Sequence, residues 1–206
     1  MMRAEKKRLI LSVAILLSAI VADQVIKFAV KLSMFKHESI RVFDWFYIYF
    51  TENKGMAFGM ELFDKLFLTS FRIVAVIFIT YYLFKIVRNV KFPTGYIVCV
   101  ASVLAGALGN LIDSIFYGEI FTDSNGRVAK LVEWGKGYGD LLYGQVVDMF
   151  YFPLFSFDWP QWMPFVGGEH FIFFSPIFNF ADACVSCGMI AIILFYGKYL
   201  NMSYKK

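Results

Sequence analysis

The sequence predicts a mainly helical membrane protein with four transmembrane helices and two substantial loops on one side of the membrane. Apolar residues make up 59% of the 206-residue chain and charged residues only 17%, a composition typical of membrane proteins. Residues 93–112 form an uninterrupted run of 20 uncharged residues, about the length that a helix needs to cross a hydrocarbon core of roughly 30 Å. We expect residues 1–206 to form one integral membrane domain.

Three further apolar stretches qualify as transmembrane helices although each contains ionisable residues. The first carries Asp23 and Lys27, the second carries Arg72 and Lys85, and the last carries Asp182. Their lengths still match the hydrocarbon core of a bilayer. We place the four helices at about residues 9–32, 66–87, 93–117 and 178–199.

Lysine and arginine gather at three places along the chain: residues 1–8, residues 88–91 and residues 198–206. With four crossings these places lie on one side, and Lys/Arg-rich short segments face the cytoplasm. We therefore expect cytoplasmic termini and two exofacial loops, at about residues 33–65 and 118–175. This topology explains the net charge of +4, and the lack of a basic stripe elsewhere argues against nucleic-acid binding.

The basic N-terminus followed by an apolar run also resembles a secretory signal peptide. The triplet Ile20-Val21-Ala22 is a poor cleavage site, and the apolar pattern continues to Leu32. We therefore expect the first transmembrane helix to remain uncleaved.

The two exofacial loops differ in composition. The first contains SIRVFDWFYIYFTEN at residues 39–53, whose aromatic and β-branched residues predict a strand. The second loop has a charged first half and an aromatic second half, with MFYFPLFSFDWPQWMPF at residues 149–165. This length and composition predict a structured extension on the membrane surface, where Trp and Tyr are favoured.

Three aspartates are predicted to meet at the exofacial membrane surface. Asp113 ends the outward-running third helix, Asp182 begins the inward-running fourth helix, and Asp148 lies in the loop between them. Asn110 and Asn179 each precede a helical aspartate by three residues. Ordinary roles stay open: capping or helix–helix hydrogen bonding for Asp113, a loop aspartate for Asp148, and interaction with the helix dipole for Asp182.

Asp23 and Lys27 lie four residues apart on the first helix and therefore share one face. Ionisable groups within a membrane are costly and are normally paired or functional. Two structural interpretations stay open here. The residues form either a local ion pair that makes the helix tolerable to lipid, or an inward-facing pair that ties the helix to polar groups of the exofacial loops.

Paired carboxylates in a low-dielectric site predict acid–base chemistry on water. Such a pair cannot easily ionise twice, so one member keeps its proton near neutral pH. The ionised member can take a proton from attacking water while the neutral member donates to an amide carbonyl oxygen. The chain has no G-x-S-x-G or H-E-x-x-H motif, and His37 and His170 have no neighbouring Cys or second His for a metal site. The pattern favours aspartic-protease chemistry without a metal or organic cofactor.

Five short motifs resemble, in order, those of the lipoprotein signal peptidase (signal peptidase II) family. They are DQVIK at residues 23–27, ENKGMAFG at 52–59, GALGNLID at 106–113, VVDM at 146–149 and FNFAD at 178–182. Each motif alone is weak evidence for the family, but the five motifs together, in the same order along four predicted transmembrane helices, are highly specific to it. The resemblance implies an aspartyl endopeptidase of the bacterial inner membrane that removes prolipoprotein signal peptides before a diacylglyceryl-modified cysteine. It also implies a small exofacial β-cradle, contact with membrane lipids, and inhibition by globomycin-type cyclic peptides.

The same motifs imply roles for individual residues. Asp148 and Asp182 match the catalytic pair, Asp113 matches a supporting aspartate, and Asp23 and Lys27 match a stabilising pair. The positions that match residues lining or shaping the pocket are Asn53, Gly55, Asn110, Asn179 and Ala181.

Two departures from the family pattern are visible. Ser114 stands where the family usually has an arginine after the GNLID aspartate. That arginine would pair with a carboxylate or a substrate carbonyl, and another cation such as Arg127 is a candidate to replace it. The segments before VVDM and between VVDM and FNFAD are also longer than usual, which could reshape the cover of the site or recruit a partner.

The alternative is a non-enzymatic protein with four spans that binds cations or protons through Asp113, Asp148 and Asp182. A transporter more often shows an internal repeat and polar residues at mid-membrane. Here the polar residues are predicted to cluster at one face, and the motifs favour the peptidase.

Overall fold

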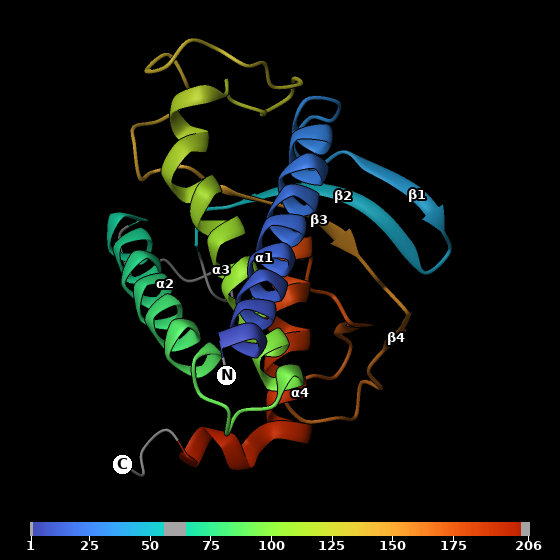
Figure 1. The fold of residues 1–206 in the computed structure, drawn as a ribbon. Coiled ribbons are helices and arrows are strands. Elements are labelled where there is room, and N and C mark those ends of the chain that lie inside the picture. The colour runs from blue at the N-terminus through green and yellow to red at the C-terminus, as the bar shows by residue number, and fades with distance from the viewer. Residues whose placement is uncertain (1, 56–64, 203–206) are drawn as a thin grey trace.

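The computed structural model, which describes residues 2–55 and 65–202, contains four long helices beside two small antiparallel sheets (Figure 1). The prediction of a four-helix membrane protein is confirmed, because all four helices are long and apolar enough to cross a membrane. Their bounds are Met2–Lys31 for α1, Lys65–Val87 for α2, Thr94–Ile120 for α3 and Phe180–Met202 for α4.

Helix α3 is the centre of the bundle. Of its most apolar stretch 56% is buried inside the protein, against 17% or less for the other three helices, because α3 packs against each of them. Their shared core includes Tyr96, Ile97 and Leu104 of α3. Large apolar side chains of α1, α2 and α4 point outward and are exposed, as expected for helices surrounded by lipid.

Gly106 allows α4 to approach α3 closely. A Cβ atom built on Gly106 would lie 2.2 Å from the carbonyl oxygen of Ala181 and 2.7 Å from Cγ2 of Val185. A residue without a side chain is therefore needed here, as is common where membrane helices touch. The contact places the first turn of α4, which carries Asp182, directly against α3.

Three strands form an antiparallel sheet in the order β1–β2–β3. This sheet and the two-stranded hairpin described below agree with the small β-structure implied by the family resemblance. The sheet lies at one end of the bundle, opposite the end that holds the N-terminus and the α2–α3 connection (Figure 1). The strands are β1, Ser39–Phe43, β2, Phe46–Asn53, and β3, Val146–Tyr151.

The segment predicted as one strand, residues 39–53, forms two strands instead. Phe43 pairs with Phe46, so the chain reverses between them and β2 returns along β1. The turn contains neither glycine nor proline, and the aromatic pattern continues through it, which concealed the reversal. Strand β2 then pairs with β3 so that Asp148 lies opposite Thr51.

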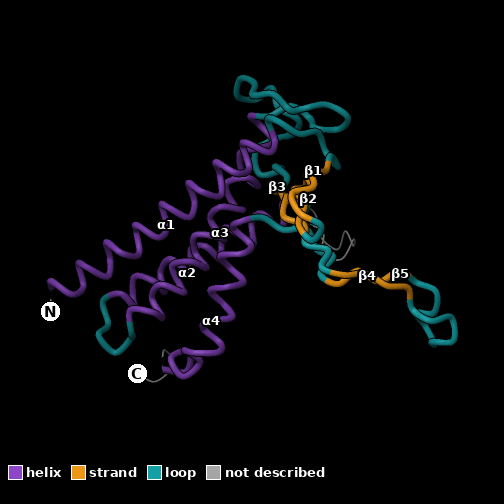
Figure 2. The backbone as a smooth tube through the Cα atoms, turned by 90° about the vertical axis from the view of Figure 1, so that its right-hand side faces the viewer, coloured by secondary structure: helices purple, strands orange, loops and turns teal. Residues whose placement is uncertain are grey.

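The long insertion before α4 is structured, as predicted. Residues 122–145 form irregular backbone with short turns, and the chain then enters β3. After β3 it forms a separate two-stranded hairpin of β4, Phe155–Asp158, and β5, His170–Phe173. Figure 2 shows this hairpin extending sideways, beyond the three-stranded sheet and away from the helices.

Replacement of Gly106 by alanine is expected to lower the free energy of unfolding by about 1–3 kcal/mol, the usual range for overpacking. The measurement is thermal unfolding in detergent. Gly197→Ala on α4 is the control, because its new methyl group would lie more than 4 Å from every described atom other than those of its chain neighbours and its own helix backbone. It receives the same gain in helix propensity. Equal melting temperatures for the two variants would contradict the close-contact role of Gly106.

Candidate active site

Lys27 lies at the centre of a buried polar network between α1 and α3. Its ammonium group is 2.9 Å from Asp23 Oδ2 and 2.8 Å from Asp113 Oδ2, and it donates to Asn110 Oδ1 at 2.9 Å. The side chains of Asp23, Lys27 and Asp113 are almost completely buried. The structure therefore supports the inward-facing interpretation of the Asp23–Lys27 pair, although α3 rather than a loop supplies most of its partners.

Asp23 joins α1 to the beginning of α4. Its Oδ1 atom accepts a hydrogen bond of 2.9 Å from the backbone N–H of Ala181, one of the amides left free at a helix N-terminus. Gly109 provides the space for this contact, since a Cβ there would lie 2.7 Å from Asp23 Oδ2. Ala181 thus contributes to the site through its backbone and its small size.

Asp113 joins α3 to the sheet. Its Oδ2 atom accepts from the backbone N–H of Val147 at 3.2 Å, and its Oδ1 atom accepts from Gln24 Nε2 at 3.0 Å. Because Asp113 is 0% exposed and its two oxygens are occupied, it fits a supporting role. Asp113 thereby holds β3 against α3 at Val147, the residue that precedes Asp148.

Asp148 lies on β3 and accepts a hydrogen bond of 2.6 Å from Nδ2 of Asn179. Burial, and then the negative charge of Asp182, raise the pKa of the Asp148 carboxyl from its ordinary value to about 7. A buried carboxyl beside another carboxylate is expected to behave in this way. Asp148 can therefore hold a proton near neutral pH.

Asp182 lies in the first turn of α4 and forms a capping arrangement with Asn179. The Asp182 backbone N–H donates to Asn179 Oδ1 at 2.8 Å, and the Asn179 backbone N–H donates to Asp182 Oδ2 at 3.4 Å. This reciprocal pattern stabilises a helix N-terminus. The other oxygen, Asp182 Oδ1, accepts from Asn110 Nδ2 at 2.8 Å, so the ordinary capping role and the predicted convergence occur together.

Asn110 and Asn179 connect the two aspartates. Asn179 Nδ2 donates to Asn110 Oδ1 at 3.0 Å as well as to Asp148, while Asn110 donates to Asp182. The structure therefore brings Asp148 and Asp182 into one hydrogen-bonded group through two amide side chains. The sequence identified both asparagines as candidate site residues, and the structure adds that they lie between the two carboxylates.

The elements carrying these aspartates are joined by a short backbone pairing. Phe150 and Phe178 exchange hydrogen bonds, with the Phe150 N–H donating at 2.8 Å and the Phe178 N–H donating at 3.1 Å. This bridge closes the insertion that separates β3 from α4. Asp148 and Asn179 consequently face each other across the junction.

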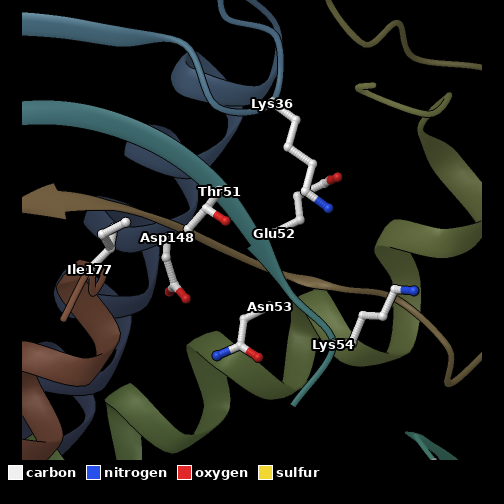
Figure 3. Close-up of a pocket in the computed structure, with 7 residues that line it drawn as sticks. All are labelled: Lys36, Thr51, Glu52, Asn53, Lys54, Asp148 and Ile177. Carbon is white, nitrogen blue, oxygen red and sulfur yellow. The ribbon is translucent and has the colours of Figure 1, made fainter. Parts of the chain in front are cut away.

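Asp148 opens onto a pocket of about 530 Å³. In Figure 3 its carboxylate and the Asn53 side chain lie on the same side of strand β2. Asn53 Oδ1 accepts a hydrogen bond of 2.7 Å from the Gly55 N–H, and Gly55 has a φ of 94°, a conformation that favours glycine. Residues 56–59 of the ENKGMAFG motif lie outside the described residues. The lining consists of Lys36, Thr51, Glu52, Asn53, Lys54, Asp148 and Ile177.

Arg72 is a site residue that the sequence analysis did not assign. Its Nη1 atom donates to Ser114 Oγ at 2.6 Å, and its guanidinium interacts electrostatically with the carboxylates of Asp182, Asp113 and Asp148. The suggestion that Arg127 supplies a cation beside Ser114 is wrong, because Arg127 is exposed and contacts Asp123. The sequence feature that could have identified Arg72 is its place in an apolar helix, because a charged side chain there is costly unless it is paired.

Two more polar contacts were not foreseen. Gln24 accepts a hydrogen bond of 3.0 Å from the hydroxyl of Tyr117 in addition to donating to Asp113. Lys31, at the end of α1, forms a buried ion pair with Glu52 of β2. Both fix α1 against neighbouring elements.

Within residues 2–55 and 65–202, no group of three or more His, Cys, Asp or Glu side chains could hold a metal ion.

Four membrane-spanning helices and a group of buried carboxylates, one of which lines a pocket, define a polytopic membrane protein with a candidate acid–base site. The family model described as Signal peptidase (SPase) II matches residues 15–197. The chain belongs to this family, the lipoprotein signal peptidases, and is thus a membrane protease of lipoprotein processing.

Individual relatives agree with this membership. A lipoprotein signal peptidase of Porphyromonas gingivalis is 49% identical over 189 residues, covering 92% of this chain and 84% of the relative. One from Amoebophilus asiaticus is 35% identical over 186 residues, covering 87% of this chain and 75% of the relative. A bacterial membrane enzyme solved by the in meso method is 24% identical with a TM-score of 0.62, covering 95% of this chain and 91% of that one, and it supports the fold.

Arg72→Ala is expected to reduce proteolysis by about 10–100-fold, since a hydrogen bond to a charged group contributes about 1.5–3 kcal/mol. The measurement is cleavage of a lipid-modified prolipoprotein in detergent. Adding Ser114→Arg to this variant is expected to restore part of the rate, because the side chain at position 114 already lies 2.6 Å from the Arg72 guanidinium.

The control for the Arg72 variant is Lys85→Ala, which removes an exposed cation from the same helix. Wild-type activity in Arg72→Ala would show that Arg72 is not required. An unrestored rate in a folded double variant would show that a cation from position 114 cannot replace it.

Proposed function

We propose that this protein is an aspartyl endopeptidase that cleaves prolipoprotein signal peptides before the diacylglyceryl-modified cysteine. The observation that carries the proposal is the placement of Asp148 and Asp182 in one hydrogen-bonded group with Asn110 and Asn179. Asp148 also lines the pocket. Two linked carboxylates, one of which lines a cavity, can provide both an acid and a base for hydrolysis of an amide.

The different environments of the two aspartates suggest different proton states. Asp148, whose pKa is raised to about 7 by burial and by Asp182, is the member that carries the proton. Asp182 lies at the N-terminus of α4 and accepts hydrogen bonds from Asn110 and from a backbone amide. Asp182, whose carboxylate is oriented by these donors, is assigned as the initial base.

The first step is attack by water. Asp182 takes a proton from the water as the water oxygen forms a bond to the scissile carbonyl carbon, and Asp148 gives its proton to the carbonyl oxygen. The product is a neutral gem-diol, with Asp182 now protonated and Asp148 ionised. Arg72, which lies within electrostatic range of both aspartates, limits the charge that accumulates there.

The second step breaks the carbon–nitrogen bond. Asp182 gives its proton to the departing amide nitrogen, and Asp148 takes a proton from one hydroxyl of the gem-diol. The products are the carboxylic acid of the signal peptide and the free amino group of the modified cysteine. Both aspartates return to their starting proton states, and neither step requires a cofactor.

We infer that this site faces the exofacial, periplasmic side of the inner membrane and that both termini are cytoplasmic. The basic residues of the first turns of α1 and of the α2–α3 connection lie at the opposite end of the bundle from the sheets (Figure 1), in agreement with the positive-inside rule. The substrate's acyl chains can remain among lipids while its peptide enters the pocket. Globomycin-type peptides are expected to bind the same pocket.

Asp148→Asn and Asp182→Asn are each expected to abolish cleavage, because each removes a proton donor or acceptor needed in both steps. The measurement is cleavage of diacylglyceryl-modified prolipoprotein by purified protein in detergent. Asp140→Asn, at an exposed loop aspartate, is the matched control and should retain activity. Cleavage that persists in either dyad variant overturns the assignment, whereas a normal rate for Asp113→Asn shows only that Asp113 is dispensable.

The kcat/KM value for cleavage is expected to decline as the pH rises through about 7. The Asp148 proton is present below its raised pKa of about 7 and is lost above it, and the first step requires that proton. The hydrogen bond from Asn179 lowers the pKa of Asp148, so residual activity in Asn179→Ala should decline at a higher pH. A rate that does not change across this range would contradict the role of Asp148 as the acid.

A further inference from the structure

The β4–β5 hairpin has two chemically different faces. Its register pairs Phe155 with Phe173 and Phe157 with Phe171, and side chains alternate between the faces of a strand. One face is therefore made of four phenylalanines, with the rings of Phe155 and Phe173 stacked at 4.7 Å. The other face carries Ser156, Ile172 and the hydrogen-bonded side chains of Asp158 and His170.

The aromatic face is left uncovered by the part of the chain that the structure describes. All four residues of β4 are exposed, and no residue of the hairpin belongs to the hydrophobic clusters of the described chain. An isolated two-stranded hairpin is marginal in water unless its apolar face is packed. The exposed aromatic face therefore indicates a surface that binds something outside the protein.

The tip of the hairpin is more apolar still. Residues 159–168 contain no charged side chain, while Trp162 is 80% exposed and Phe165 is 100% exposed. Phe165 also has a φ of 73°, a conformation that a bulky residue rarely adopts. A phenylalanine kept in a strained backbone position with its ring fully outside the protein suggests a functional contact.

We propose that the β4–β5 hairpin is a lipid anchor that lies on the outer leaflet of the bilayer, with its aromatic face and its tip among the lipid headgroups and upper acyl chains. The hairpin leaves the bundle between β3 and α4 and extends sideways from it, as Figure 2 shows. Like the lipid-facing helix α4, the hairpin exposes large apolar side chains. Uncharged surfaces rich in Trp and Phe, backed by a polar face, are typical of segments that lie in a membrane interface.

This proposal adds a function to the segment that joins Asp148 to Asp182. Phe152 and Phe174, at the base of the hairpin, contact Phe178 beside the site, with ring centroids 5.6 and 5.9 Å apart. An anchored hairpin would hold these elements at a constant depth relative to the lipids. The inference concerns where the hairpin lies and does not depend on the proposed catalytic steps.

The test is the depth of Trp162 in the full-length protein reconstituted into phosphatidylcholine–phosphatidylglycerol nanodiscs. Trp45, Trp134 and Trp159 are replaced by Phe so that Trp162 is the fluorescent reporter. We expect lipids brominated near the headgroup end of the acyl chain to quench Trp162 several-fold more than they quench an aqueous reporter. That reporter is Asn125→Trp, at an exposed turn flanked by charged residues, in a chain whose four tryptophans are all Phe.

Two further variants separate the anchor from general effects on folding. Phe165→Asp places a charge at the tip, at a φ that Asp tolerates better than Phe, and should reduce the bromolipid quenching of Trp162 several-fold. Ser156→Asp places the same charge on the polar face and should leave the quenching unchanged.

Three outcomes would overturn the proposal. Acrylamide quenching of Trp162 as strong as that of the aqueous reporter, without a bromolipid effect, would place the tip in water. Protection from both quenchers would indicate contact with protein, either a second copy or another partner. An equal loss of quenching in Phe165→Asp and Ser156→Asp would show that the aromatic tip has no special contact with lipid.

Discussion

The architecture of the site depends on the burial of Lys27 between Asp23 and Asp113. Charges removed from water are tolerated only when they are paired and hydrogen-bonded, and breaking such a pair usually costs about 3–5 kcal/mol. The constraint extends beyond α1 and α3, because Asp23 also binds the first turn of α4 and Asp113 also binds β3. The buried Lys27 thereby fixes the positions of α1, α3, α4 and β3 relative to one another.

Amide side chains, rather than further charges, connect that structural network to Asp148 and Asp182, the two aspartates proposed to be catalytic. Asn110 accepts from Lys27 and donates to Asp182, and Asn179 donates to both Asp148 and Asn110. Each asparagine can donate and accept at once, so both carboxylates are oriented by neutral hydrogen-bond donors. A lysine in place of Asn179 would hold Asp148 ionised, and the pair would lose its acid.

The four transmembrane helices and the residues that lie around Asp148 and Asp182 could be predicted from the sequence, whereas contacts between distant elements could not. The uncharged run at residues 93–112 predicts a span because bilayer thickness dictates helix length. The reversal between Phe43 and Phe46 was missed because its turn carries no glycine or proline. The bond between Arg72 and Ser114 depends on how α2 is rotated against α3, which a pattern along one chain does not specify.

The length of the insertion between the VVDM and FNFAD motifs has little bearing on the relative positions of Asp148 and Asp182. The backbone pairing of Phe150 with Phe178 closes the segment at its base, and the entropic cost of closing a loop grows only slowly with its length. The aromatic contacts of Phe152 and Phe174 with Phe178 strengthen the same junction. Asp148 and Asp182 are therefore positioned by the bridge and by the buried network, and the chain between them is free to acquire a separate surface. The hairpin is such a surface, because its aromatic face lies outside both hydrophobic clusters that the described residues form around the site and the bundle.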